Sequence, residues 1–471
     1  MGPPPAAAAA PKRGRRWSQW YFPRLCGTVD PVTEPEVVRH DTRLDRYVGH
    51  YAARTHGMRA SAVRALFAVA NRPEVVSLAG GMPNIADLPL DVVGDAIRDL
   101  VLEHGTQAMQ YGSGQGEPAL RERICEVMSL EGINAHPDDV TITVGSQQGL
   151  DLVTRIFCDP GDVIVAEAPS YVGALGTFAS YQTQVVHVAM DDDGIEPDAL
   201  RAAVDASRTA GRRPKFLYTI PNFNNPSGIS QSLERRRQVI ETCRELDLLI
   251  VEDNPYGLLR LEGDPLPALR AMDADQVIYL GSFSKTFAPG FRVGWVLAPH
   301  AVREKLVLAQ ESATLCPPVF SQLAVATYLD RHDWRGQIEA FKDMYRARRD
   351  AMLEALREYM PPGTTWTTPG GGFFVWVTLP DGLDAQAMLP RAVSARVAFT
   401  PGTAFYADGF GSRNMRLSFC YPTPERIREG VRRLAEVVNR EYEVNRTFGI
   451  GSQQSPHHGT DVSGAPAPDQ S

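Results

Sequence analysis

One lysine of this chain stands in a setting suited to covalent chemistry. Lys285 lies in the stretch from Gly281 to Trp295, after a predicted strand, with the hydroxyls of Ser282 and Ser284 beside it. An amine in an apolar setting near positive charge is held neutral, so it can form a Schiff base with an aldehyde cofactor. Arg292 offers a planar fork for a phosphate, to which both hydroxyls can add donors. An isolated Ser-x-Ser-Lys is more often a surface turn, so the whole stretch is what favours this interpretation.

Two further polar residues follow predicted strands. Asp253 ends the predicted strand 248–253, and open α/β sheets bind ligands beyond the carboxyl ends of their strands. A carboxylate there can pair with a protonated ring nitrogen, although a helix-capping role before Pro255 is the simpler alternative. Asn225 follows the predicted strand 216–220 in a segment that is also good turn chemistry in any protein.

A third segment has the features of an anion site. Ser146 and Gln147 lie between the predicted strand 140–144 and a helix that we expect to begin near Gln148. Free backbone N–H groups and the helix dipole then point toward a phosphate. A plain N-cap is the alternative reading of this segment.

Composition excludes several classes of function. The 471 residues carry 48 Lys and Arg against 56 Asp and Glu, so the net charge of -8 gives no basic footprint for nucleic acid. The six cysteines are at least 33 positions apart, which leaves no clustered metal site. No apolar run approaches the roughly 20 residues of a membrane span. We therefore expect a cytoplasmic protein with no metal, membrane or nucleic-acid partner.

Strand-like runs alternate with helical stretches through the first two thirds of the chain. Several runs are apolar at consecutive positions, which is typical of strands covered by helices on both faces. The pattern predicts an α/β fold with a mostly parallel central sheet. The predicted strands are 140–144, 163–167, 185–188, 216–220, 248–253 and 277–281.

The last third predicts a smaller α+β unit. A long amphipathic helix is expected over 334–360, and short strands over 373–378, 397–400 and 415–419. Another helix is expected over 60–70. The expected domain limits are a disordered leader 1–36, an N-terminal segment 37–95 that joins the small domain, a large cofactor-binding domain 96–330, a C-terminal small domain 331–446 and a disordered tail 447–471.

The stretch around Lys285 is similar to the lysine signature of the class I and II aminotransferases, which bind pyridoxal 5'-phosphate (PLP) on fold type I. The resemblance covers about residues 57 to 445 and implies an enzyme that moves an amino group from an L-amino acid to a 2-oxo acid through pyridoxamine phosphate. Other blocks that carry it are 78–83, 110–116, 143–149, 167–171, 221–228, 252–256 and 416–419.

The resemblance also implies roles around the cofactor. Lys285 would be both the anchor of PLP and the general base, and Asp253 the partner of its ring nitrogen. Tyr256 and Asn225 match residues that hydrogen-bond the phenolic oxygen of PLP. Tyr171 matches the aromatic residue that stacks on the pyridine ring.

On the substrate side, Arg416 resembles the arginine that grips the α-carboxylate, together with Asn225. Gly81 lies where backbone approaches the substrate. Tyr111 resembles the tyrosine that reaches the phosphate of a neighbouring subunit, which implies a homodimer.

Some alternatives remain within the resemblance. The same fold supports decarboxylases, lyases and oxidases, although Arg416 disfavours decarboxylation, which needs the carboxylate free to leave. A non-catalytic regulator would need a winged helix, and only about 55 residues precede the similar region. Segments 77–83 and 110–116 look most like the α-aminoadipate and kynurenine type, except that Ser113-Gly114 replaces the frequent Pro-Thr.

Overall fold

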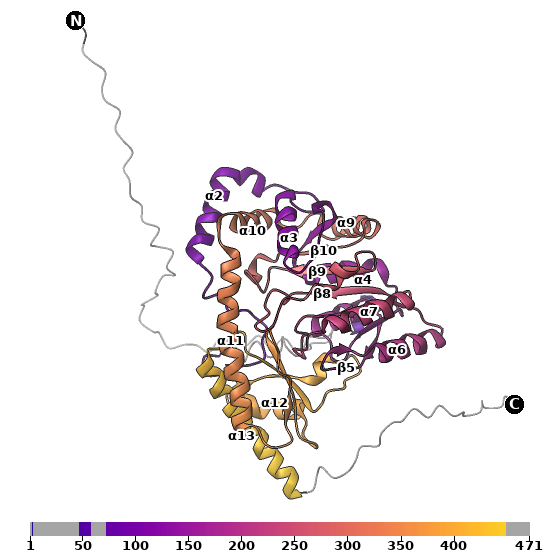
Figure 1. Ribbon diagram of the computed structural model, residues 1–471, viewed down its shortest axis with the longest axis vertical. Coiled ribbons are helices and arrows are strands. Elements are labelled where there is room, and N and C mark those ends of the chain that lie inside the picture. Colours follow the sequence, from indigo (N-terminus) through magenta and orange to yellow (C-terminus); the bar gives the residue numbers. More distant parts are fainter. Residues whose placement is uncertain (1, 3–46, 58–71, 449–471) are drawn as a thin grey trace, which may run out of the picture. The chain divides into compact units, whose positions relative to one another are not determined.

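The computed structural model describes residues 2, 47–57 and 72–448 (Figure 1). The chain divides into two units, Met1–Tyr51 and Ala52–Ser471. Of the first unit, Gly2 and a segment with the short turn η1 (Val48–His50) are described. The second unit begins with η2 (Ala53–Gly57). Most of the expected leader, the helix expected over 60–70 and the tail beyond residue 448 lie outside the described residues.

The large sheet has seven strands in the order β2-β10-β9-β8-β7-β3-β4. Every neighbouring pair is parallel except those of β10, which runs antiparallel to both β2 and β9. The predicted α/β class with a mostly parallel sheet is thus confirmed, and each predicted strand lies within two residues of an observed one. The bounds are β2 Val140–Thr143, β3 Val163–Glu167, β4 Gln184–Val188, β7 Pro214–Thr219, β8 Leu249–Asp253, β9 Val277–Ser282 and β10 Gly294–Leu297.

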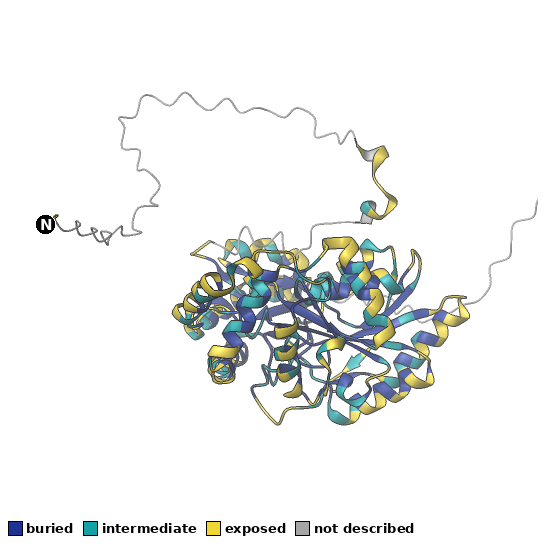
Figure 2. Cartoon of the chain, turned by 90° about the horizontal axis from the view of Figure 1, so that it is seen from above, coloured by how far each residue is buried: buried dark blue, intermediate teal, exposed yellow. Residues whose placement is uncertain are grey.

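Helices cover both faces of this sheet, which is why its strands are apolar at consecutive positions (Figures 1 and 2). Along β3, Ile164 and Ala166 pack in one core with α4, α5 and α9, whereas Val165 packs in a second core with α6 and α7. The covering helices are α4 Gly145–Phe157, α5 Val172–Ser180, α6 Pro197–Thr209, α7 Leu233–Glu245, α8 Leu269–Met272 and α9 His300–Thr314.

Helix α4 begins at Gly145, three residues before the expected start. Gly145 has a φ of 74°, a conformation that favours glycine. The side chain of Gln148 reaches back and accepts a hydrogen bond from the backbone N–H of Val144 at 2.6 Å. Gln148 therefore lies inside the helix, and its side chain caps the first turn as the Glu or Gln of a capping box does.

The smaller sheet has the order β11-β12-β15-β14, and the long helices α11 and α13 pack together beside it (Figure 1). Helix α11 ends one residue before the expected limit. The strand expected over 397–400 is two strands, because the chain changes partner at Phe399: β13 pairs with β1, and β14 pairs with β15. The bounds are β1 Val76–Ser77, β11 Thr365–Trp366, β12 Phe374–Thr378, β13 Val397–Ala398, β14 Thr400–Pro401, β15 Asn414–Ser418, α11 Trp334–Tyr359, α12 Ala385–Ser394 and α13 Pro424–Phe448.

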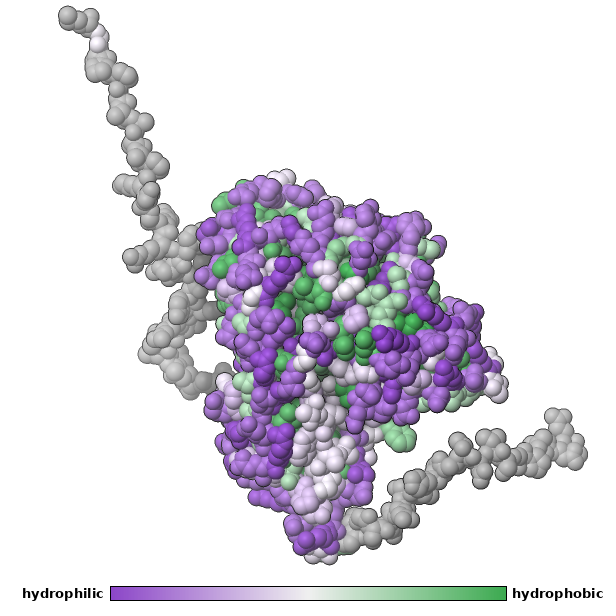
Figure 3. All heavy atoms as spheres, viewed as in Figure 1, coloured by the Kyte–Doolittle hydropathy of each residue, from purple (hydrophilic) through white to green (hydrophobic). Residues whose placement is uncertain are grey.

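Hydrophilic residues cover most of the surface visible in Figure 3. No helix among the described residues is long and apolar enough to cross a membrane. The remaining elements are α2 Leu90–Ala108, α3 Pro118–Ser129, α10 Val319–Arg331, the hairpin strands β5 Met190–Asp191 and β6 Gly194–Ile195, and the short turns η3 Pro137–Asp139, η4 Pro289–Phe291 and η5 Gly402–Phe405.

Candidate active site

Twelve of the thirteen residues singled out from the sequence line one cavity of about 370 Å³. Most of them follow the carboxyl ends of β2, β3, β7, β8 and β9, and Arg416 comes from β15 of the smaller sheet. The exception is Tyr111, which lies outside this cavity with 77% of its surface exposed. The twelve are Gly81, Ser146, Gln147, Tyr171, Asn225, Asp253, Tyr256, Ser282, Ser284, Lys285, Arg292 and Arg416.

Lys285 follows β9 and points into this cavity. Its Nζ donates a hydrogen bond to the backbone oxygen of Gly81 at 2.7 Å and lies 5.6 Å from the ring centre of Phe373. Removal from water lowers the pKa of Lys285 to about 8, and the positive charges of Arg416 and Arg292 act in the same direction. The neutral amine, the form that reacts with an aldehyde, is therefore far more populated near neutral pH than in an exposed lysine, at about a tenth of the molecules at pH 7.

Asp253 ends β8 and is buried. Its Oδ2 accepts a hydrogen bond from the hydroxyl of Tyr218 at 2.8 Å, whereas its buried Oδ1 has no partner among the described residues. Desolvation raises the pKa of this carboxyl to about 6, and the hydrogen bond from Tyr218 opposes the shift. A buried acceptor without a partner is uncommon, and a protonated pyridine nitrogen is a donor that would satisfy it.

The same cavity also has groups suited to binding a phosphate. Ser146 and Gln147 lie in the first turn of α4, where free N–H groups and the helix dipole attract an anion. Arg292 adds a cation: its Nη1 donates to Ser284 Oγ at 3.3 Å and its Nη2 to the backbone oxygen of Val144 at 3.2 Å. A Cβ at position 145 would collide with this guanidinium, so glycine is required beside it.

Arg416 lies in β15 of the smaller sheet and is buried. Its Nη1 donates to Asn225 Oδ1 at 2.8 Å and its Nη2 to the backbone oxygen of Ala79 at 2.6 Å. The guanidinium carbon lies 4.1 Å from the ring centre of Phe374. Desolvation lowers the pKa of Arg416 to about 10, so the side chain is still positively charged at neutral pH. A planar cation fixed in this way is suited to a carboxylate.

Two tyrosines supply the aromatic part of the wall. Burial raises the pKa of Tyr256, whose ring packs against Phe373 with 5.3 Å between centres. Tyr171 precedes α5, and a Cβ at Gly173 would collide with its ring. Glycine at position 173 thus lets the Tyr171 ring lie close to the backbone of α5.

A buried carboxylate behind the cavity fixes the loop that carries Asn225. Glu167, at the end of β3, accepts hydrogen bonds from Thr219 Oγ1 at 2.6 Å, from the N–H of Ile220 at 3.0 Å and from Asn224 Nδ2 at 2.5 Å. Desolvation raises its pKa to about 7. Asn224 Oδ1 in turn accepts from the N–H of Ser227 at 3.0 Å, which closes the loop around Asn225.

Several of these contacts were not predicted from the sequence. Tyr218 could have been found from the sequence, because it places a polar hydroxyl beside the apolar residues of a predicted strand. Nothing in the local sequence indicates the contacts made by the backbone oxygens of Ala79 and Gly81 or by the ring of Phe374. Their roles depend on which distant segments the fold brings to Arg416 and Lys285.

The fold and this cavity together define the class: a PLP-binding enzyme of fold type I. The aminotransferase class I and II family profile matches residues 73–434. The chain belongs to this family and is a PLP-dependent aminotransferase, as the sequence predicted.

Individual relatives agree with this assignment. Aromatic-amino-acid aminotransferase 1 of Thermococcus litoralis is 42% identical over 84% of this chain and 95% of its own length. 2-Aminoadipate transaminase of Thermus thermophilus is 37% identical over 81% of this chain and 94% of its own length. The crystal structure of Pyrococcus horikoshii kynurenine aminotransferase superposes with a TM-score of 0.81 at 40% identity, covering 85% of this chain and 99% of that one.

Proposed function

We propose that Lys285 carries PLP and moves the α-proton during transamination between an L-amino acid and a 2-oxo acid. The observation that supports it best is that Lys285, the half-satisfied carboxylate of Asp253 and the cation of Arg416 line one cavity. When bound, PLP accepts into its ring the electron pair released at the substrate α-carbon. Asp253 would pair with the ring nitrogen, and the first turn of α4 with Ser282, Ser284 and Arg292 would hold the phosphate.

In the proposed reaction Arg416 and Asn225 orient the substrate by its α-carboxylate. Their mutual hydrogen bond of 2.8 Å fixes both groups before substrate arrives, which lowers the entropic cost of alignment. The amine of Lys285, with its pKa lowered to about 8, takes and returns the α-proton near neutral pH. Tyr171 would stack on the ring of the cofactor, and Tyr256 would hydrogen-bond its phenolic oxygen.

Replacing Lys285 with Ala tests this function. We expect the loss of the base and of the covalent anchor to reduce kcat by about 10⁴-fold or more, and the visible absorption of protein-bound PLP to change. Lys215→Ala, at a surface lysine paired with Asp162, is the matched control and keeps wild-type turnover. Normal turnover of Lys285→Ala would overturn the proposal. In a single half-reaction the wild-type enzyme forms 2-oxo acid and pyridoxamine phosphate in equal amounts.

For the amino donor we propose aromatic amino acids and 2-aminoadipate. The support is that two of the relatives above are named as an aromatic-amino-acid aminotransferase and a 2-aminoadipate transaminase. The rings of Phe374 and Phe405, 4.1 and 4.9 Å from the guanidinium of Arg416, give the carboxylate site an aromatic border. A panel of donors with 2-oxoglutarate as acceptor ranks them by kcat/KM, and turnover confined to branched donors would contradict the proposal.

We further propose that the enzyme is a homodimer in which Tyr111 reaches the phosphate site of the neighbouring subunit. The support is a group of exposed large side chains on and after α2, namely Leu102 at 76%, Met109 at 70% and Tyr111 at 77% exposure. Light scattering should give twice the chain mass. Tyr111→Phe should weaken PLP binding about tenfold, the value of one hydrogen bond to a charged group. A monomer with full activity would contradict this proposal.

We also propose limits for the two domains and a cellular location. The two separate sheets support a large domain of about 96–330 and a small domain of about 331–446, to which the segment before residue 96 is joined through β1. The free thiols of the described cysteines support a cytoplasmic location.

A further inference from the structure

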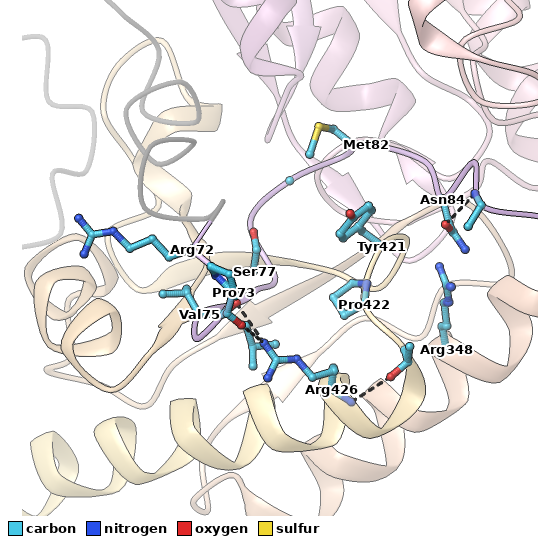
Figure 4. Close-up of a pocket in the computed structure, with 14 residues that line it drawn as sticks. Arg72, Pro73, Val75, Ser77, Met82, Asn84, Arg348, Tyr421, Pro422 and Arg426 are labelled. Carbon is cyan, nitrogen blue, oxygen red and sulfur yellow. Dashed lines mark hydrogen bonds between the residues drawn. The ribbon is translucent and has the colours of Figure 1, made fainter. Parts of the chain in front are cut away.

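A second cavity, of about 530 Å³, lies beside the catalytic one. Its walls come from the segment 72–86, from α11 and from the start of α13 (Figure 4). Met82 lines both cavities, and its neighbour Gly81 accepts the hydrogen bond of Lys285. One short segment of backbone thus forms a boundary shared by the two spaces.

The charge of this second cavity is of one sign. The described residues that line it include Arg72, Arg348 and Arg426, and none of them is an Asp or Glu. Arg348 is only 7% exposed, and its one hydrogen bond runs from Nη1 to the backbone oxygen of Cys420 at 2.5 Å. No carboxylate of the described residues forms an ion pair with it, although the charge of Asp87 acts on Arg348 from farther away and favours its charged form. Figure 4 shows Arg348 extending from α11 toward Asn84.

The next residue on the same helix provides an internal comparison. Arg349 is 4% exposed, as buried as Arg348, but it pairs with Glu262 at 2.5 Å and with Asp350 at 2.7 Å. A buried cation without a counter-ion costs several kcal/mol, and proteins normally avoid that cost by pairing. Within one turn of α11, therefore, one arginine has its anions in the chain and the other faces a cavity.

Two more groups direct positive charge into the same space. Arg426 donates from Nη2 to the backbone oxygens of Pro73 at 3.0 Å and Val75 at 3.3 Å, again with no carboxylate partner among the described residues. Helix α13 begins at Pro424, directly after Thr423, whose Oγ1 accepts from the N–H of Arg426 at 3.4 Å. The positive end of a 25-residue helix therefore lies at the wall of this cavity, where the carboxylate of Glu425 in the first turn offsets part of that charge.

We propose that this cavity is a second binding site, which takes a small carboxylate through Arg348, supported by Arg426 and the N-terminus of α13. A carboxylate matches the planar guanidinium and supplies the counter-ion that Arg348 lacks. The rest of the wall is largely apolar, with Val75, Val76 and Pro422, and suits a short carbon chain better than a highly charged phosphate. The carboxylate belongs either to a separate metabolite or to the side chain of a substrate that also contacts Arg416.

Titration calorimetry of the PLP-loaded enzyme with glutarate tests the site without turnover, so its result is independent of the role of Lys285. Arg348→Met removes the charge and keeps the chain length, and Arg349→Met is the matched control on the same helix. We expect Arg348→Met to weaken glutarate binding at least tenfold, about 1.4 kcal/mol, and Arg349→Met to leave it unchanged. Arg426→Gln repeats the test should Arg348→Met fail to fold.

The pattern of binding distinguishes the two sources of the carboxylate. A separate metabolite site gives two glutarates per chain in the wild type and one in Arg348→Met, with kcat/KM unchanged for all donors. A substrate side-chain site gives one glutarate, bound more weakly by Arg348→Met, and a kcat/KM that falls for 2-aminoadipate but not for phenylalanine. Equal glutarate binding by the wild type, Arg348→Met and Arg426→Gln overturns the proposal. Binding of inorganic phosphate that depends on Arg348, without such binding of glutarate, also overturns it.

Discussion

Two buried carboxylates end the strands on either side of β7, and they differ in how they are satisfied. Glu167 ends β3 and Asp253 ends β8, with 0% and 5% of their surfaces exposed. Desolvation raises the pKa of both, to about 7 and about 6. Glu167 accepts hydrogen bonds at both of its oxygens, whereas Asp253 has a partner at Oδ2 alone.

This difference separates a structural carboxylate from a functional one. Glu167 uses its acceptors to fix Asn224 and the loop behind the cavity, so nothing in its surroundings requires a ligand. Asp253 lines the cavity with an acceptor left over. A shifted pKa is common to both groups and does not distinguish them, but the number of satisfied oxygens does.

The largest expected effect comes from Asp253→Asn. The substitution keeps the shape and removes the charge that we propose pairs with the cofactor, so we expect kcat to fall by about 10²–10³-fold. The apoprotein should be no less stable at pH 8 than the wild type, because an ionised buried carboxylate has been replaced by a neutral amide. Steady-state kinetics and urea unfolding of the apoprotein measure the two quantities.

Asp205→Asn, at an exposed position of α6, is the control for this change. It should alter neither quantity. If the activity of Asp253→Asn stayed within threefold of the wild type, Asp253 would not have the functional role that distinguishes it from Glu167.

Glu167→Gln should show the opposite behaviour, a loss of stability that depends on pH. Below pH 4.5 Glu167 is protonated in both the folded and the unfolded protein. Between pH 4.5 and about 7 the unfolded chain releases this proton and the folded protein keeps it, so the wild type loses stability as the pH rises. Glutamine at this position adds no such dependence, although its amide N–H₂ faces donors that need an acceptor.

We therefore expect Glu167→Gln to be less stable than the wild-type apoprotein by about 2 kcal/mol at pH 5. Between pH 5 and pH 8 the wild type should lose about 2–3 kcal/mol, since each pKa unit is worth about 1.4 kcal/mol, so the two proteins should be about equally stable at pH 8. Urea unfolding at both pH values gives these free energies. A difference that is the same at pH 5 and pH 8 would show that Glu167 is ionised throughout and would contradict the comparison.

The sequence predicted Asp253 as a site residue and Glu167 only as the last residue of a strand, and it did not predict how either carboxylate is satisfied. Strand periodicity and the turn after each strand located Asp253 and Lys285 at one edge of the sheet, because parallel strands end together. What satisfies each group depends on contacts distant in sequence. Tyr218 lies 35 positions from Asp253, Gly81 lies 204 from Lys285 and Ala79 lies 337 from Arg416. No local pattern encodes such pairs, and the same reason hid the unpaired charge of Arg348.

The smallest expected effect concerns the hydrogen bond that Asp253 accepts from Tyr218. Tyr218→Phe removes the hydroxyl that donates to Oδ2 and that lowers the pKa of Asp253, so this pKa should rise further above its ordinary value. The apparent pKa on the acid side of the pH profile of kcat/KM should then rise by up to about one unit. Activity should be reduced at pH 6 and nearly normal at pH 8. Tyr181→Phe, which removes a hydroxyl bonded to Asp151 at 3.2 Å away from the cavity, is the matched control. An unchanged apparent pKa in Tyr218→Phe would mean that this pKa reports a group other than Asp253, and the assignment of the ring-nitrogen partner would have to be tested again at Glu167.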